Sequence, residues 1–377
     1  MREWLARLIC IAAILVTLTA CGTQTSTLPK PFKGEIIGLN MLNRDVGWAS
    51  GLSSSGEAAV LATNDGGHTW RRLTPPQLHS VPRLSMDPVS RSEAWIATVN
   101  SKGRVDACQT RTSGRSWQCF YVTAPNGEQV RALWPSQVDF INASTGWIEL
   151  QQYTGLVSAR AALWQTLDGG RTWQQLFPLA YSGFGMAGPV AFSSPKLGVH
   201  IVSTSYGYGN GLGGPGVYTT TNGGHSWTSQ FLPDNMKGKN QKALPAYGMQ
   251  AVSDDAQLWI VRRDRISSAL SIGAPIVDLF GRDMVAAAFG DPLESHNDAI
   301  TYFSYDAGQH WLRVLPLRSP LDRFISAYAQ YSITQLDFIN RQVGFLVLSK
   351  RDVLRSVMFR TVDGGTHWEE VWASPTG

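Results

Sequence analysis

An eight-residue pattern recurs six times along this chain and constrains its fold more than any other feature. The pattern is Ser/Thr-x-Asp-x-Gly-x-Ser/Thr-Trp, with a few substitutions. The copies occupy residues 63–70, 110–117, 166–173, 220–227, 304–311 and 361–368. A repeat at this spacing indicates stacked supersecondary units rather than one irregular core.

Each copy is interpreted as a tight hairpin turn, called a box hairpin below, with an acidic or polar side chain and a tryptophan at fixed places. The Asp position holds Asp65, Thr112, Asp168, Asn222, Asp306 and Asp363, and the last position holds Trp70, Trp117, Trp173, Trp227, Trp311 and Trp368. We expect the carboxylate to accept backbone N–H groups two residues on, as in an Asx turn. We expect the tryptophan to pack beneath its own sheet.

A second anchor precedes each hairpin, for example Trp48, Trp147 and Trp259, in an alternating apolar run that indicates a strand. Another strand lies just upstream. Each unit therefore has four strands, A to D, with the box hairpin between C and D. Four-stranded units that repeat around an axis predict an all-β propeller of antiparallel blades.

The spacing of the anchors favours six blades, with seven as the alternative. From anchor to box tryptophan the fifth unit spans 52 residues, from Trp259 to Trp311, while the other five span 22 to 28. We assign this excess to an insertion at about residues 265–297 in blade 5. A hidden seventh blade would need at least the shortest repeat seen elsewhere, and the excess is shorter than that.

The first residues are typical of an exported lipoprotein. Arg2 and Arg7 precede an apolar run that is short for a membrane span, which favours a cleaved signal over residues 1–20. Leu18-Thr19-Ala20-Cys21 resembles the bacterial lipobox, so Cys21 is the predicted lipidation site. Residues 21–33 then form a flexible tether, and residues 34–377 form the propeller. The expected location is the outer face of the cell membrane.

Two further cysteines flank the second box hairpin symmetrically. Cys108 and Cys119 are therefore candidate cross-strand partners in a disulfide. The exported setting allows it. Because this hairpin has Thr112 in place of an aspartate, we hypothesise that the disulfide replaces the lost side-chain bonds.

The hairpins match the Asp-box (BNR) repeat of sialidases and related propellers. The order of a Gly-Trp strand followed by Asp-Gly-Gly-x-Thr-Trp resembles the group that includes the photosystem II assembly and stability factors. This resemblance implies an extracytoplasmic propeller that binds proteins during assembly. It leaves the partner unidentified, beyond an expected association with the membrane.

An enzyme is not expected. The Arg-Ile-Pro of sialidases is missing, since Arg265-Ile266 is followed by serine, and no pair of carboxylates suggests a glycosidase. One carboxylate per loop is too few for calcium. We therefore predict no catalytic residue, metal or cofactor. Without residues 1–20 the chain keeps 30 basic and 27 acidic residues, a bias too small to indicate nucleic acid.

Strand order puts the box turns and A–B turns on one face, and the B–C loops and D–A connectors on the other. We predict a protein-binding surface on that second face, in the loops of blades 4 and 5, and expect deletion of residues 266–296 to leave folding intact. The candidate binding residues are Arg131, Trp134, Tyr181, Phe184, Tyr206, Tyr208, Tyr247, Arg323 and Tyr328. Carbohydrate or cell-wall binding by the same aromatics is the alternative, and a sialidase-like hydrolase is disfavoured.

Overall fold

Each repeated unit folds into a four-stranded antiparallel sheet, as the alternating apolar runs predict. The computed structural model describes residues 32–75, 78, 81, 83–124, 126–130, 134–155, 158–177, 186–203, 216–231, 239–244, 249–253, 257–262, 266–271, 276–280, 284–289, 300–314 and 331–375. The signal, Cys21 and nearly all of the tether lie outside these ranges. Within them, no helix is both long and apolar enough to cross a membrane.

The strands follow one another along the chain, and each run of four forms one sheet. The first three sheets are β1 (Gly34–Met41), β2 (Gly47–Ser53), β3 (Ala58–Thr63) and β4 (Arg71–Arg72); β5 (Leu84–Pro88), β6 (Ala94–Val99), β7 (Val105–Thr110) and β8 (Gln118–Tyr121); and β9 (Trp134–Phe140), β10 (Gly146–Gly155), β11 (Ser158–Thr166) and β12 (Gln174–Phe177). The fourth is β13 (Met186–Phe192), β14 (Gly198–Ser203), β15 (Gly216–Thr220) and β16 (Thr228–Phe231).

The remaining three sheets complete the series. They are β17 (Lys239–Leu244), β18 (Met249–Ser253), β19 (Gln257–Arg262) and β20 (Ile266–Ser271); β21 (Ile276–Phe280), β22 (Met284–Phe289), β23 (Ile300–Ser304) and β24 (Leu312–Val314); and β25 (Ser332–Phe338), β26 (Gly344–Lys350), β27 (Arg355–Thr361) and β28 (Glu369–Ala373). A 3₁₀ turn, η4 (Arg351–Val353), connects β26 to β27.

The described residues thus form seven sheets, and the preference for six was wrong. Residues 265–297 are not an insertion in one blade, since they contain β20 of the fifth sheet and β21 and β22 of the sixth. Deleting residues 266–296 would remove strands from two sheets, so the expectation of intact folding was wrong too. The anchor spacing led to the wrong number of blades because the fifth repeat is short: β17 and β21 begin only 37 residues apart, at Lys239 and Ile276. The fifth sheet is short and has no box hairpin, and Trp259 lies in its third strand, β19.

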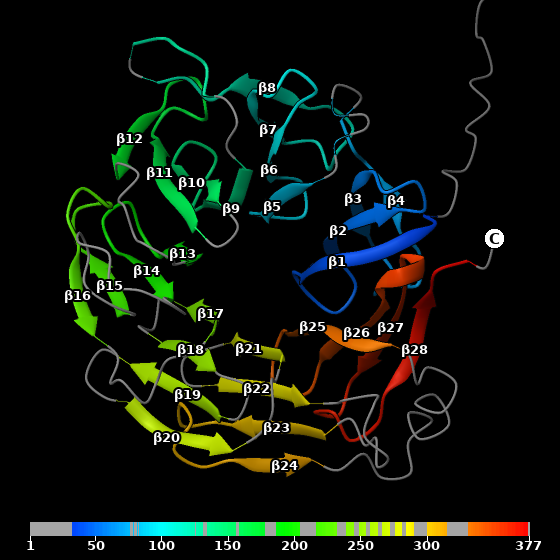
Figure 1. Cartoon of the computed structure of the whole chain (residues 1–377). Coiled ribbons are helices and arrows are strands. Elements are labelled where there is room, and N and C mark those ends of the chain that lie inside the picture. The colour runs from blue at the N-terminus through cyan, green and yellow to red at the C-terminus, as the bar shows by residue number, and fades with distance from the viewer. Residues whose placement is uncertain are drawn as a thin grey trace, which may run out of the picture. The chain divides into compact units, whose positions relative to one another are not determined.

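The sheets form a β-propeller in which each sheet packs against the next. First strands contact one another in order from β5 through β9, β13, β17 and β21 to β25, while β2 contacts β5 and β25 contacts β1. Figure 1 shows the same order, with the first strand of each sheet on the inner side and the fourth on the outer side. The contact between β25 and β1 closes the series.

The first and last sheets are joined by side-chain contacts, and no described strand belongs to both of them. The N–H of Ile36 donates to Ser356 Oγ at 2.9 Å, and Gln335 Nε2 donates to the carbonyl of Ile37 at 2.9 Å. Phe32 stacks on Trp372 with ring centroids 6.4 Å apart. The first and last sheets also share one apolar core, which joins Ile36 and Ala49 to Phe345 and Met358. Bonds to the backbone fix the register of the two sheets, and the apolar burial supplies most of the favourable free energy.

Aromatic side chains fill the contacts between neighbouring sheets. Trp95 of the second sheet stacks on Phe140 of the third at 3.9 Å, and Trp147 of the third stacks on Phe192 of the fourth at 3.6 Å. The indole Nε1 of Trp173 and of Trp227 donates to a carbonyl of its own hairpin at 3.0 Å. The rings of Trp70, Trp117, Trp173, Trp227 and Trp368 lie in apolar clusters that join neighbouring sheets, rather than beneath their own sheets as predicted. Trp117 illustrates this, since its Nε1 donates to the carbonyl of Leu73 in the preceding sheet at 2.8 Å.

The predicted polarity of the two faces is confirmed. Gly66 N, in the first box turn, donates to the carbonyl of Asp45 in the A–B turn of its own sheet at 2.8 Å. Gly169 N makes the same bond to Ser144 at 2.9 Å, and Gly364 N makes it to Gln342 at 2.9 Å. The box turns and the A–B turns therefore share one face, which we call the box face.

Candidate functional site

Each box hairpin is held by its own set of side-chain hydrogen bonds. In the first, Thr63 Oγ1 donates to Asp65 Oδ1 at 2.7 Å and accepts the N–H of Gly67 at 3.0 Å. The N–H of Thr69 donates to the same Oδ1 at 2.9 Å, and Thr69 Oγ1 donates to Asp65 Oδ2 at 2.6 Å. The carboxylate thus binds a backbone N–H four residues on, not two as predicted. The threonine hydroxyl takes the nearer N–H instead.

The same bonds recur where the residue types differ. Asn222 Oδ1 accepts the N–H of Ser226 at 2.9 Å, and Asp306 Oδ2 pairs with His310 Nδ1 at 2.5 Å. Burial opposes ionisation of Asp306, but the bonds from His310 and Ser304 outweigh it and lower its pKa to about 2. Burial is likewise outweighed at Asp65, Asp168 and Asp363, where hydrogen bonds within the hairpin lower the pKa. Each carboxylate therefore accepts hydrogen bonds from within its own turn.

The second hairpin keeps most of this network without an aspartate. Thr112 Oγ1 accepts the N–H of Ser116 at 2.9 Å and lies 2.8 Å from Ser116 Oγ. Its contact with Thr110 Oγ1 stretches to 3.5 Å. Cys108 and Cys119 are disulfide-bonded directly across β7 and β8, as predicted. The hypothesis that the disulfide replaces lost side-chain bonds was wrong in its premise, because a hydroxyl at position 112 still holds the turn.

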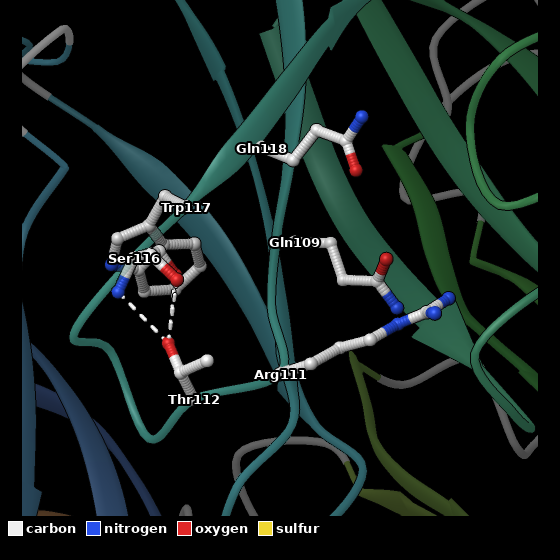
Figure 2. Close-up of a pocket in the computed structure, with 6 residues that line it drawn as sticks. All are labelled: Gln109, Arg111, Thr112, Ser116, Trp117 and Gln118. Atoms are coloured by element: carbon white, nitrogen blue, oxygen red, sulfur yellow. Dashed lines mark hydrogen bonds between the residues drawn. The ribbon is translucent and has the colours of Figure 1, made fainter.

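A polar hollow lies beside this second hairpin. It has a volume of about 180 Å³, and it is lined by Gln109, Arg111, Thr112, Ser116, Trp117 and Gln118. Figure 2 shows Gln109, Arg111 and Gln118 on one side of the hairpin, with Trp117, Ser116 and Thr112 on the other. This volume leaves room for several water molecules or for one small polar group of a partner.

Arg111 is positioned in this hollow by the next sheet. Its Nη2 donates to the carbonyl of Ala143, in the A–B turn of the third sheet, at 3.2 Å. Its Nε lies 3.9 Å from Glu93 Oε1, which also accepts Gln109 Nε2 at 2.6 Å. The Arg111 side chain is still 60% exposed. A guanidinium held at one edge and open at the other can bind a carboxylate with little loss of side-chain entropy.

The second position of the box pattern points outward in two other hairpins. Leu167 is 63% exposed and Val362 is 50% exposed, large fractions for apolar side chains. Leu197, in the A–B turn of the fourth sheet, is 37% exposed. These three residues stand on the box face and were not among the predicted binding residues. Their signal was an apolar residue in the outermost turn of an otherwise polar hairpin.

Buried aspartates on the first strands were also missed. Asp87 Oδ2 accepts the N–H of Phe140 in the next sheet at 2.5 Å, and Asp139 Oδ2 accepts that of Phe192 at 2.5 Å. Burial raises the pKa of Asp87 to about 6. Burial and the nearby charge of Asp87 raise the pKa of Asp139 well above its ordinary value. These carboxylates bind backbone in the inter-sheet contacts, so they join sheets.

The predicted binding residues fall largely outside the described part of the chain. Trp134 begins β9, but its side chain lies outside the described part of the structure. The others lie outside the described residues: Arg131, Tyr181, Phe184, Tyr206, Tyr208, Tyr247, Arg323 and Tyr328. The proposed surface on the second face stays a prediction.

Comparison with known proteins places the fold among β-propellers. No protein-family model and no curated protein sequence matches the chain. Among solved structures, one described as YCF48 bound to D1 peptide is 19% identical and covers 88% of this chain and 94% of its own, with a TM-score of 0.56. A post-proline cleaving enzyme from Rickettsia typhi is 10% identical over 91% of this chain and 53% of its own, with a TM-score of 0.54. A lectin from Aleuria aurantia, in complex with a fucosylated disaccharide, is 9% identical over 92% and 96%, with a TM-score of 0.45.

Proposed function

We propose that this chain is a membrane-anchored, extracytoplasmic β-propeller that binds protein and acts as a non-catalytic assembly scaffold. The observation that carries the proposal is the likeness to YCF48 over 88% of this chain and 94% of that one, in a structure that holds a bound peptide. At 19% identity the likeness concerns the fold, so the bound peptide supports a protein partner as a class and names none.

The anchor is proposed from the sequence. A signal over residues 1–20 would leave Cys21 as the first residue and the site of lipidation, 13 residues before β1 begins at Gly34. Several acyl chains on one cysteine suffice for stable attachment. The Cys108–Cys119 disulfide supports an oxidising compartment outside the cytoplasm.

A non-catalytic role is supported by how the acidic groups are used. Asp65, Asp168, Asp306 and Asp363 each bond within a separate hairpin, on different sheets. Glycoside hydrolysis typically needs two carboxylates that converge on one substrate. The match to the Rickettsia enzyme covers only about half of that longer chain.

A carbohydrate ligand is the second candidate. The hollow beside the second hairpin combines the amides of Gln109 and Gln118 with the indole of Trp117. Such planar polar groups beside an aromatic ring also suit a sugar.

Chemical crosslinking in the native membrane, followed by mass spectrometry, tests the protein-binding proposal. We expect the full chain to crosslink to one membrane-associated protein, and we expect Cys21→Ala to release the chain from the membrane and lose that product. Crosslinks to no protein, with the chain intact in the membrane, would contradict the proposed function.

A further inference from the structure

We infer that the box face over the second to fourth sheets is the docking surface, and that it takes an extended acidic peptide segment carrying apolar side chains. The inference rests on the proposed protein-binding function and names the surface and the chemistry of the partner. It places binding on the face opposite to the one favoured by the sequence.

This surface carries an excess of positive charge. The A–B turns and box turns of these three sheets carry Arg91, Arg111, Arg115, Arg171 and Lys196 against Glu93 and Asp168, and all five cations are exposed. Both carboxylates are already bound, Asp168 by Thr172 and Glu93 by Gln109. The same turns of the first and seventh sheets carry Arg44 and Arg341 against Asp45, Asp65 and Asp363. The excess of positive charge is therefore local, and it favours an acidic partner.

Arg111 is held in place by groups of its own sheet and of the next sheet. The Ala143 carbonyl and Glu93 hold Nη2 and Nε of the guanidinium, and the 60% exposed side chain lies beside the Gln109 amide (Figure 2), open to a partner. The hollow of about 180 Å³ has room for one carboxylate with part of its chain. A carboxylate there would receive charge-assisted hydrogen bonds, which are stronger than neutral ones.

Two exposed apolar side chains, Leu167 and Leu197, lie on the neighbouring third and fourth sheets. The second box position faces the A–B turn of the next sheet, as shown by the bond from Arg111 to Ala143 and by Arg341 stacked over Tyr305 at 4.3 Å. Leu167 has this position in the third sheet, and the next A–B turn carries Leu197. Exposed apolar side chains on the same surface as exposed arginines suit a protein contact.

Fluorescence anisotropy with the full chain tests this surface. The probe is a short labelled peptide of alternating Glu and Leu, compared with the same peptide carrying Gln or Lys in place of Glu. We expect binding of the acidic peptide alone, weakening as salt rises. Arg111→Glu and Leu167→Ser should each weaken it at least about tenfold. Val362→Ser, at the same box position on the seventh sheet, should leave it unchanged.

Equal binding of the three peptides would overturn the inference, and so would equal binding by Arg111→Glu and the unaltered chain. Displacement of the peptide by neutral methyl glycosides would overturn it by assigning the hollow to carbohydrate. Failure of this inference is distinct from failure of the proposed function. If the acidic peptide does not bind while the native membrane partner still crosslinks, the docking surface is wrong and the protein-binding function stands.

Discussion

The backbone N–H of Met41 in the first sheet donates to Asp337 Oδ2 in the last sheet at 2.5 Å. The same bond joins Phe140 to Asp87, Phe192 to Asp139 and Phe338 to Asp278 at 2.5 to 2.6 Å. An aspartate on one first strand thus accepts the N–H of the next first strand at four contacts between sheets. The contact that closes the propeller, between the last and first sheets, therefore has the same hydrogen bond as the contacts between other neighbouring sheets.

Removing this bond at the closing contact should destabilise the fold. Asp337→Ala leaves the Met41 N–H buried without its acceptor, which costs about 1 to 3 kcal/mol of unfolding free energy. The measurement is urea unfolding followed by tryptophan fluorescence. Asn40 is the matched control, because it holds in the first sheet the place that Asp337 holds in the last, and it is exposed. In the second sheet the place of Met41 is taken by Pro88, which has no N–H for Asn40 to accept. Asn40→Ala should cost less than about 0.5 kcal/mol, and equal losses for both variants would contradict this role of Asp337.

Sequence patterns predicted the elements that depend on local contacts. The box turns, their shared face with the A–B turns and the Cys108–Cys119 pair follow from residues within one hairpin, so the chain itself specifies them. The fifth sheet was missed because it has no box hairpin, and its strands are recognisable only through pairing with one another.

The inter-sheet contacts could not be predicted for a different reason. Asp87 and Phe140 lie 53 residues apart, and nothing local marks Asp87 as an acceptor for the next sheet. The exposed Leu167 is an ordinary residue at a variable position until the fold places it beside a basic surface. Long-range packing decides both, because the residues around each position do not indicate what it meets on the neighbouring sheet.

The buried aspartates should make stability fall as pH rises through weak acid. The pKa of Asp87 is about 6 in the folded protein against 3.8 as its ordinary value, because burial disfavours the charge. Between these pH values the folded state binds a proton that the unfolded chain does not, so the unfolding free energy is larger near pH 5 than near pH 7.5. Between pH 5 and pH 7.5 this group changes the unfolding free energy by about 1.4 kcal/mol.

Asp87→Asn should flatten this slope, and chemical unfolding across the pH range checks it. Below about pH 4 the slope should reverse, because the box aspartates have lowered pKa values, about 2 for Asp306, and lose their stabilising bonds as they take up protons. A stability that rises from pH 5 to pH 7.5, or an unaltered slope in Asp87→Asn, would show that Asp87 is not the titrating group.

A glycine of the second hairpin should be required for packing as well as for turn geometry. Gly114 has φ +76°, and an added Cβ would lie 2.7 to 3.0 Å from side-chain atoms of Leu73 in the preceding sheet. Gly103, in the same sheet, has φ +70° and nothing within 4 Å of an added Cβ. Gly103→Ala should cost about 1 to 2 kcal/mol from the left-handed backbone alone, and Gly114→Ala about 1 to 3 kcal/mol more. Thermal unfolding of the two variants compares them directly, and equal losses would refute the close contact with Leu73.

The disulfide should stabilise the protein without being needed for the hairpin. It joins residues 11 positions apart, so replacing both cysteines by serine should cost about 3 kcal/mol. Urea unfolding with and without reductant measures this loss, and reductant should have no effect on the double variant. Because Thr112 still holds the turn, the double variant should fold and bind as before. A double variant with undiminished stability would contradict the stabilising role.

The most direct measurement is site-specific photo-crosslinking in the native membrane. A photoreactive residue replaces either Leu167 on the box face or Lys102, which is exposed in the B–C loop of the second sheet on the opposite face. The account predicts a protein adduct from position 167, competed by the acidic peptide, and none from position 102. Adducts from position 102 alone would contradict the docking surface, and adducts from neither position in a correctly anchored chain would contradict a protein-binding scaffold on this face.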